Sequence, residues 1–245
     1  MNIWKLSKYL DELLKIKEID DISLNGLVIE GKRDVKRVGF CVDTSIEVIK
    51  MAIKEDLDLI IAHHGIYWGH PLPIKGGLHE KLKLFLESGI GLYVAHLPLD
   101  AHPLYGNNIQ GVRLFSPDDI IPVLDIGFLG KFNTPRKQKE ILDVAKEKIN
   151  PNTILWNFGN EEIEKFIFIS GDALSMLPKV IELGVNTYIT GEPKHSLYTM
   201  AKEEKVNVLL TGHYMSETLG IKALSKHIEE KFFLNTVFLD FPTGY

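Results

Sequence analysis

Short apolar runs alternate with amphipathic segments along this chain, and this alternation limits the folds open to it more than any other feature. Four apolar runs of strand length occur in the first half, at residues 26–31, 37–42, 57–62 and 91–95. Helical spacing of apolar residues marks 2–16, about 45–55 and 78–88, with Thr44 or Ser45 as the cap of the second helix. Strands that alternate with helices pair as a parallel sheet with helices on its faces, so the sequence predicts an α/β fold.

The second half repeats this pattern. We expect helices near 135–148, 174–183, 193–204 and from about 215, and strands at 154–158, 165–170, 186–190, 207–211 and 234–240. Asp43 precedes His63 by 20 positions and Asp172 precedes Glu192 by 20, and both halves then end a strand with histidine followed four residues later by an acid. We therefore predict two similar α/β units, a first domain at 1–125 and a second at 126–245, with the C-terminal segment packing back on the first. The alternative is two unrelated units that share a spacing by accident.

The composition is that of an ordinary soluble globular protein. The 245 residues are 45% hydrophobic and 25% charged, and the net charge is −5. Lys and Arg are not gathered into a run, so the charge does not indicate a nucleic-acid partner. Cys41 is the only cysteine, which favours a buried, reduced thiol over a disulfide framework. Because no apolar stretch approaches membrane-spanning length, we expect a cytoplasmic protein without membrane contact.

Polar side chains collect where the predicted strands end. In open α/β sheets the ligand site forms beyond the carboxyl ends of the strands. The residues expected there are His63, His64, His96, Asp100, Glu192 and His213. A lone histidine after an apolar strand is usually a hydrogen-bonded structural group, but four of them, two followed at i+4 by an acid, favour a metal site.

The spacing of these residues suggests how metal ions are held. His213 and Glu217 stand at i and i+4 on one helix face, and Asp100 occupies the corresponding place in the first half. The pleat at the end of the strand is expected to splay His63 and His64 apart, so that one imidazole serves each of two ions. Imidazole and carboxylate ligands without thiolate suit Zn, Fe, Mn, Co or Ni, so the identity of the two divalent ions stays open.

Such a centre would serve hydrolysis, because metal ions activate water and polarise carbonyl or phosphoryl oxygens. We interpret His96 as the catalytic proton carrier, with Tyr214 as a weaker candidate for that role. Glu192 is interpreted as an acceptor for the second ring nitrogen of a ligand histidine. For Tyr214 and for Glu192 the alternative is an ordinary hydrogen-bonded residue. Tyr67 and Trp68 either pack in the core or border a substrate pocket. The segment 106–108 is interpreted as a turn, and Asp172 as a helix N-cap.

The ordered set of motifs resembles one known family. The segments are LIIAHHGIYWG, AHLPLDAHPLYGNN, SGDAL, TGEPKH and GHYMSETLG, preceded by NGLVIEG. Together they span nearly the whole chain and resemble the NIF3-like family, whose members are often labelled GTP cyclohydrolase 1 type 2 homologues. The chain lacks the large middle insertion of some relatives. Pro98 stands in a segment where many relatives have a Thr-His-Thr-x-Asp pattern, which puts the shape of that loop in question.

The resemblance implies two α/β domains with a dinuclear metal centre between them, assembled as a toroidal homohexamer. Carried over position by position, the metal ligands are His63, His64, Asp100, His213 and Glu217. The leading hypothesis is a metal-dependent hydrolase in which metal-activated water attacks a nucleotide-like or cyclic amide substrate. The alternatives are a non-catalytic, metal-stabilised binding or adaptor ring and a ring that contacts nucleic acid. No Gly-rich phosphate loop or basic cluster points to GTP itself.

Overall fold

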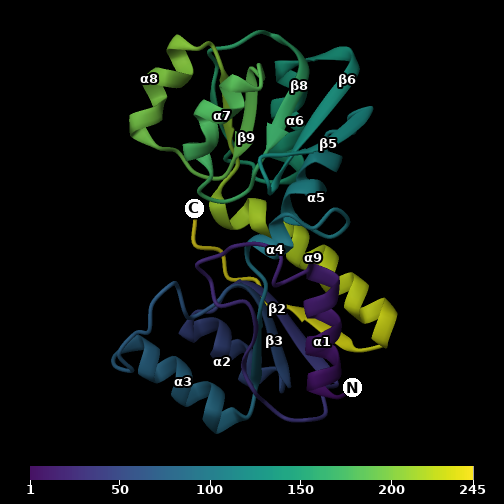
Figure 1. The fold of residues 1–245 in the computed structure, drawn as a ribbon, viewed down its shortest axis with the longest axis vertical. Helices are drawn as coiled ribbons and strands as arrows, with labels where there is room; N and C mark the ends of the chain where they lie inside the picture. Colours follow the sequence, from purple (N-terminus) through teal and green to yellow (C-terminus); the bar gives the residue numbers. More distant parts are fainter. Residues whose placement is uncertain (245) are drawn as a thin grey trace. The chain divides into compact units, whose positions relative to one another are not determined.

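The computed structural model describes residues 1–244 and divides into two compact units (Figure 1). The first unit comprises residues 1–99 and 221–241, and the second comprises residues 100–220 and 242–244. This division differs from the predicted boundary at 125/126. Residues 119–137 form a hairpin that pairs with a strand of the second sheet, which is why they belong to the second unit. Residues 235–238 near the C-terminus pair with a strand of the first sheet.

The first unit is a five-stranded sheet in the order β1-β4-β3-β2-β11. Its strands are β1 (Gly26–Ile29), β2 (Arg37–Asp43), β3 (Leu59–His64), β4 (Gly91–Val94) and β11 (Asn235–Phe238). Four strands run parallel, and β1 pairs antiparallel with β4. The buried runs of β2, β3 and β4 are typical of parallel strands that are covered on both faces.

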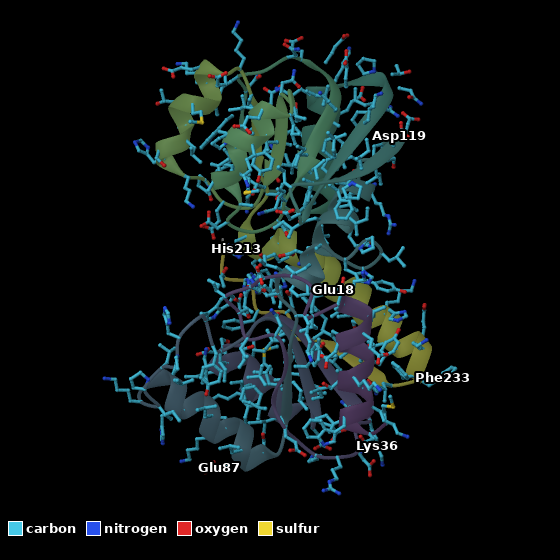
Figure 2. All side chains as sticks on the ribbon, in the orientation of Figure 1. Glu18, Lys36, Glu87, Asp119, His213 and Phe233 are labelled. Carbon is cyan, nitrogen blue, oxygen red and sulfur yellow. The ribbon has the colours of Figure 1, made fainter. Side chains whose placement is uncertain are left out.

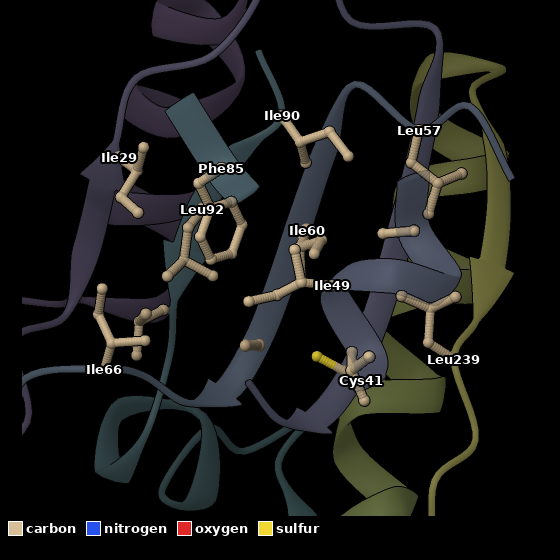
Figure 3. Packing of buried hydrophobic residues seen from close by; sticks show 14 residues of the cluster. Ile29, Cys41, Ile49, Leu57, Ile60, Ile66, Phe85, Ile90, Leu92 and Leu239 are labelled. Carbon is tan, nitrogen blue, oxygen red and sulfur yellow. The ribbon is translucent and has the colours of Figure 1, made fainter. Parts of the chain in front are cut away.

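Helices cover both faces of this sheet. They are α1 (Ile3–Leu14), α2 (Ile46–Lys54), α3 (Gly77–Ser88) and the second part of α9 (His213–Phe232). Cys41, Ile60 and Leu92 face α2 and α3, where they pack against Ile49 and Phe85 (Figure 3). On the opposite face, α1 and α9 lie side by side (Figure 1). The predicted cap of α2 is Ser45, whose Oγ accepts the N–H of Val48 at 3.1 Å.

The second unit is a six-stranded sheet in the order β5-β6-β8-β9-β10-β7. Its strands are β5 (Asp119–Val123), β6 (Gly127–Lys137), β7 (Ile154–Trp156), β8 (Glu162–Phe168), β9 (Thr187–Thr190) and β10 (Asn207–Leu210). Only β8, β9 and β10 are parallel to one another. One face packs against η1 (Leu174–Met176), α7 (Leu177–Glu182) and α8 (His195–Glu203). The other packs against α5 (Asn107–Arg113), α6 (Gln138–Lys148) and the first part of α9.

The predicted duplication is confirmed by the topology. The element order α1-β1-β2-α2-β3-α3-β4 matches α6-β7-β8-α7-β9-α8-β10, and the neighbour order β1-β4-β3-β2 matches β7-β10-β9-β8. In both units the first of these strands is antiparallel to the last. The units differ at the outer edge, where β2 pairs with the parallel β11 and β8 with the antiparallel β6. Each repeat therefore ends a buried strand, β4 or β10, just before a histidine.

None of the helices formed by residues 1–244 combines the length and the apolar composition needed to cross a lipid bilayer.

Candidate metal centre

His63 and His64 lie at the carboxyl end of β3, and each ring is held by an acceptor on a neighbouring strand. The fully buried His63 directs Nδ1 to the carbonyl oxygen of Ala95, just beyond β4, at 2.9 Å. The Nδ1 atom of His64 lies 2.8 Å from Oδ1 of Asp43, at the end of β2. The two ring centroids are only 4.8 Å apart at the carboxyl end of β3, although both residues belong to the strand and its pleat was expected to splay the rings apart.

His96 joins these two imidazoles from the end of β4. Its ring centroid lies 5.1 Å from that of His63 and 5.6 Å from that of His64. One ring nitrogen of each of the three histidines lies within 4.8 Å of the others, which is the spacing of groups that can hold a metal ion. The sequence interpretation treated His96 only as a proton carrier, and the structure brings it into this cluster.

Asp21 orients His96 and was not recognised from the sequence. Both of its carboxylate oxygens lie 3.0 Å from Nδ1 of His96, and Asn25 accepts the backbone N–H of His96 at 2.8 Å. Burial of Asp21 favours the neutral acid. Hydrogen bonds from His96, the backbone N–H of Ser23 and the Asn25 amide outweigh burial and hold the pKa of Asp21 well below its usual range. The carboxylate is therefore a charged anchor for the imidazole.

Trp68 flanks the histidines from the loop that follows β3. Its ring contacts His96 edge-on at a centroid distance of 5.0 Å and His64 at 5.7 Å. The sequence left two roles open for the Tyr67 and Trp68 pair. Trp68 packs against the imidazoles, whereas Tyr67 lines a cavity.

In the second unit, His213 is the first residue of α9 and lies directly beyond β10 (Figure 2). Its Nδ1 atom is 2.5 Å from Oε1 of Glu192, which follows β9, so Glu192 accepts a hydrogen bond from this ring, as both interpretations of Glu192 require. Its Nε2 atom is 3.1 Å from Oε2 of Glu217, one helical turn later. Glu217 is only 3% exposed. Tyr214, the weaker candidate for proton transfer, is buried in the same turn.

Two glycines at the ends of β8 and β9 make room for this turn of α9. A Cβ atom on Gly171 would lie 2.3 Å from Oε1 of Glu217, and one on Gly191 would lie 2.9 Å from Cα of His213. The N–H of Gly191 donates to the carbonyl oxygen of Gly171 at 3.0 Å, which extends the sheet pairing beyond the strands. Small residues are therefore required where the strands meet the helix carrying the histidine and the acid.

Asp100 lies in the second unit among buried amide and hydroxyl groups. Its Oδ1 atom accepts from Nδ2 of Asn107 at 2.9 Å and from Oγ of Ser170 at 3.2 Å. The Oδ1 atom of Asn107 in turn accepts the N–H of Gly220 in α9 at 2.6 Å. The interpretation of 106–108 as a simple turn is wrong, because Asn107 and Asn108 are fully buried at the start of α5 and hold Asp100 and Ser170. Their signal in the sequence was only an Asn-Asn pair after glycine.

Asp172 was also misassigned. The 3-10 turn that follows it has Ala173 as its cap residue and no side-chain capping bond, and Asp172 instead accepts from Nζ of Lys194 at 3.4 Å. This carboxylate interacts with the start of α8.

Four strand-end histidines share one tautomer. Carbonyl and carboxylate oxygens only accept hydrogen bonds, so the Nδ1 atoms of His63, His64, His96 and His213 must carry the proton. In the neutral imidazole this leaves the lone pair on Nε2. Metal-ligating histidines are characteristically held in this way, with the second ring nitrogen donating to a carboxylate or a backbone carbonyl.

Comparison with known proteins agrees with this architecture. A family model described as Duf34/NIF3 (NGG1p interacting factor 3) matches residues 1–243. The chain belongs to the DUF34/NIF3 family. A relative named "GTP cyclohydrolase 1 type 2 homolog" from Pyrococcus abyssi is 38% identical over 246 residues, 98% of both chains. One of the same name from Archaeoglobus fulgidus is 38% identical over 249 residues, 100% of both chains.

Solved structures of similar chains extend the DUF34/NIF3 likeness to the fold. The crystal structure of TTHA1606 from Thermus thermophilus matches with a TM-score of 0.95 at 38% identity and covers 100% of both chains. The structure titled "Reduced HcgD from Methanocaldococcus jannaschii" matches with a TM-score of 0.89 at 26% identity and covers 98% of both chains. The resemblance inferred from the motifs is thus confirmed for the whole chain.

Proposed function

We propose that this DUF34/NIF3 protein is a metal-dependent hydrolase in which His63, His64, Asp100, His213 and Glu217 together hold two divalent cations. The observation that carries the proposal is the shared tautomer, which puts the lone pair of each ligand imidazole on Nε2. Strand-end histidines whose Nδ1 atoms are held in the same way on both units fit a common ligand role.

The donor chemistry fits such ions. The proposed set contains imidazoles and carboxylates, and Cys41, the single cysteine of the sequence, is fully buried in the hydrophobic core of the first unit. A ligand set without thiolate suits Zn, Fe, Mn, Co or Ni. When bound, a pair of such ions supplies Lewis acidity and lowers the pKa of water.

His96 is proposed as the proton carrier. Asp21 holds its Nδ1–H, which leaves the lone pair on Nε2, and the ring centroid lies 5.1 Å from that of His63 and 5.6 Å from that of His64. A base so oriented can take a proton from an attacking water and return it to a leaving group. The proposed substrate is a nucleotide-like heterocycle or a cyclic amide, and the support for that class is the name carried by the curated relatives.

Elemental analysis of the purified protein tests the metal proposal. We expect about two divalent ions per chain, the usual number in a two-metal site. His64→Ala and Glu217→Gln should each lower this ratio, whereas His79→Ala, on an exposed position of α3, should not. A ratio near zero after metal supplementation, or equal loss in the His79→Ala control, would contradict the proposal.

Activity on a panel of nucleotides, cyclic amides and phosphoesters tests the hydrolase. We expect turnover of at least one class by the metal-loaded protein, lost in Glu217→Gln with the fold retained by circular dichroism. Metal-loaded protein that is inactive throughout, and whose assembly melts when the metal is removed, would instead favour the non-catalytic binding ring.

We also propose that the protein is cytoplasmic and forms a homo-oligomer, with the hexamer implied by the family resemblance as the expected form. Light scattering coupled to size exclusion measures the mass directly, and a monomeric mass would contradict the assembly. Binding to single- or double-stranded nucleic acid that weakens steeply with salt would support the nucleic-acid alternative.

A further inference from the structure

A cavity of about 750 Å³ lies beside the histidine cluster of the first unit. One wall is the segment from Asp21 to Leu24, and the other is the loop that contains Tyr67 and Pro71. The segments are joined by an isolated antiparallel bridge between Ser23 and Trp68, with the N–H of Leu24 donating to the carbonyl oxygen of Tyr67 at 3.2 Å. The backbone bonding means that the cavity is formed before any ligand arrives, and its volume is in the range of small-molecule sites.

Two residues connect this cavity to the proposed catalytic group. Asp21 lines the cavity and also holds Nδ1 of His96, and Trp68 is bridged to Ser23 while its ring contacts His96. A molecule bound in the cavity would therefore lie next to the residues that position His96.

The chemistry of the lining excludes a charged ligand group. Apart from Asp21 and His70, the lining is apolar or uncharged, and no Lys or Arg lines the cavity in the part of the chain that the structure describes. The Asp21 carboxylate is already engaged by the N–H groups of Ser23 and Leu97 and by the side chains of Asn25 and His96. It is therefore not available as a partner for a cation. A phosphate would lose its hydration here without gaining a counter-charge.

The lining also contains features suited to a flat, neutral ring. Tyr67 supplies an aromatic face, and Ile22 and Leu24, which are 69% and 54% exposed, offer apolar surface to a bound ring. Ser23 lines the same wall and is only 5% exposed, and its Oγ atom has no hydrogen-bond partner among the described residues. A buried hydroxyl without a partner favours a ligand that offers it a hydrogen bond.

We infer that this cavity is a substrate subsite for an uncharged heterocyclic ring of the nucleobase or cyclic amide type, and that it does not accept the phosphate part of a nucleotide. This inference rests on the proposed function, since it specifies the substrate class of the same centre. Among the substrates proposed above, the free ring is favoured over a nucleotide that carries phosphate.

Calorimetric titration of the metal-loaded protein with uracil, hydantoin and uridine 5′-monophosphate tests the inference. We expect uracil and hydantoin to bind, and the monophosphate to bind more weakly than uracil. Leu24→Asp places a carboxylate at an already exposed position of the cavity wall and should weaken uracil binding about tenfold. Leu86→Asp is the matched control, because Leu86 is 71% exposed on α3 and does not line the cavity.

Ser23→Ala provides a second test in case Leu24→Asp does not fold. Ser23→Ala removes only the buried hydroxyl and should weaken uracil binding while the metal ratio stays unchanged. His64→Ala should lose metal but keep uracil binding. Ring binding can therefore be measured even if the protein proves to have no hydrolase activity.

Four results would overturn the inference. Two concern the ligands: tighter binding of the monophosphate than of uracil, or no binding of either neutral ring. Two concern the variants: unchanged uracil affinity in both Leu24→Asp and Ser23→Ala, or a fall in oligomer mass in Leu24→Asp with ring binding retained. The last result would identify the exposed Ile22 and Leu24 as an interface between copies of the chain.

Discussion

Oδ1 of Asp43 lies 2.8 Å from Nδ1 of His64, and the two residues are register partners at the ends of the adjacent parallel strands β2 and β3. The sheet itself thus brings a carboxylate to the imidazole and determines which ring nitrogen carries the proton.

Asp43→Asn should lower metal affinity by about ten- to a hundredfold, the usual effect of removing a partner of a ligand histidine. The amide still reaches His64, but it lacks the charge that raises the basicity of Nε2 and can turn its NH2 group toward the ring. Metal titration with a competing chelator measures the change. Asp119→Asn, on an exposed position of β5, is the control, and equal affinity in both variants would argue against a ligand role for His64.

Gly171→Ala should destabilise the protein and displace Glu217. The residue has φ of +67°, and an added Cβ would meet Oε1 of Glu217 at 2.3 Å. Gly184→Ala is the matched control, because its φ is +64° but its nearest neighbour is the flexible Lys165 Nζ at 3.8 Å. In the control, the free energy of unfolding should fall only by the cost of a left-handed backbone conformation, about 1–2 kcal/mol. Urea unfolding and metal content should distinguish Gly171→Ala from Gly184→Ala. Equal decreases in the free energy of unfolding, with equal metal content, would show that the structure relieves the clash with Glu217.

The stability of the protein should fall in acid partly through Asp21. Its pKa is lowered in the folded state from the ordinary value of 3.8, so the carboxylate contributes stability above that value. This contribution is lost as the pH falls below 3.8 toward the folded pKa. The difference in unfolding free energy between wild type and Asp21→Asn should therefore shrink between about pH 5 and pH 3. Asp20→Asn, at the exposed neighbouring position, is the control. If the difference in unfolding free energy between wild type and Asp21→Asn did not vary with pH, a charged Asp21 would be ruled out.

Cys41 should resist thiol reagents until the protein unfolds. The side chain is fully buried in the core of the first unit, and burial together with the Asp43 carboxylate raises the pKa of its thiol. A chromogenic disulfide reagent should label about one thiol per chain in denaturant, where the single cysteine becomes accessible, and react very slowly with the native protein. Rapid labelling of the native form would mean that this core opens readily.

Much of the architecture was predictable because it depends on local pattern. Apolar runs of strand length and helical spacing predicted the parallel strands β2, β3 and β4 and the helices between them. The hairpin of β5 and β6 was not predicted, because Pro122 interrupts the short β5 and the second half of β6 is polar and exposed. For that reason the domain boundary expected near residue 125 also differed from the division into compact units.

The sequence by itself determined which residues end the strands and which acid follows a histidine by one helical turn, as in His213 and Glu217, because these relations follow from the periods of strand and helix. Only the tertiary structure decided how each imidazole is held. Asp21 reaches His96 across 75 positions of sequence, and Asn107 reaches Gly220 across 113. Asp21 and His96 meet because the start of β1 pairs with the end of β4, and Asn107 and Gly220 meet because α5 and α9 pack in the same core cluster. No local pattern of residues records these tertiary neighbours.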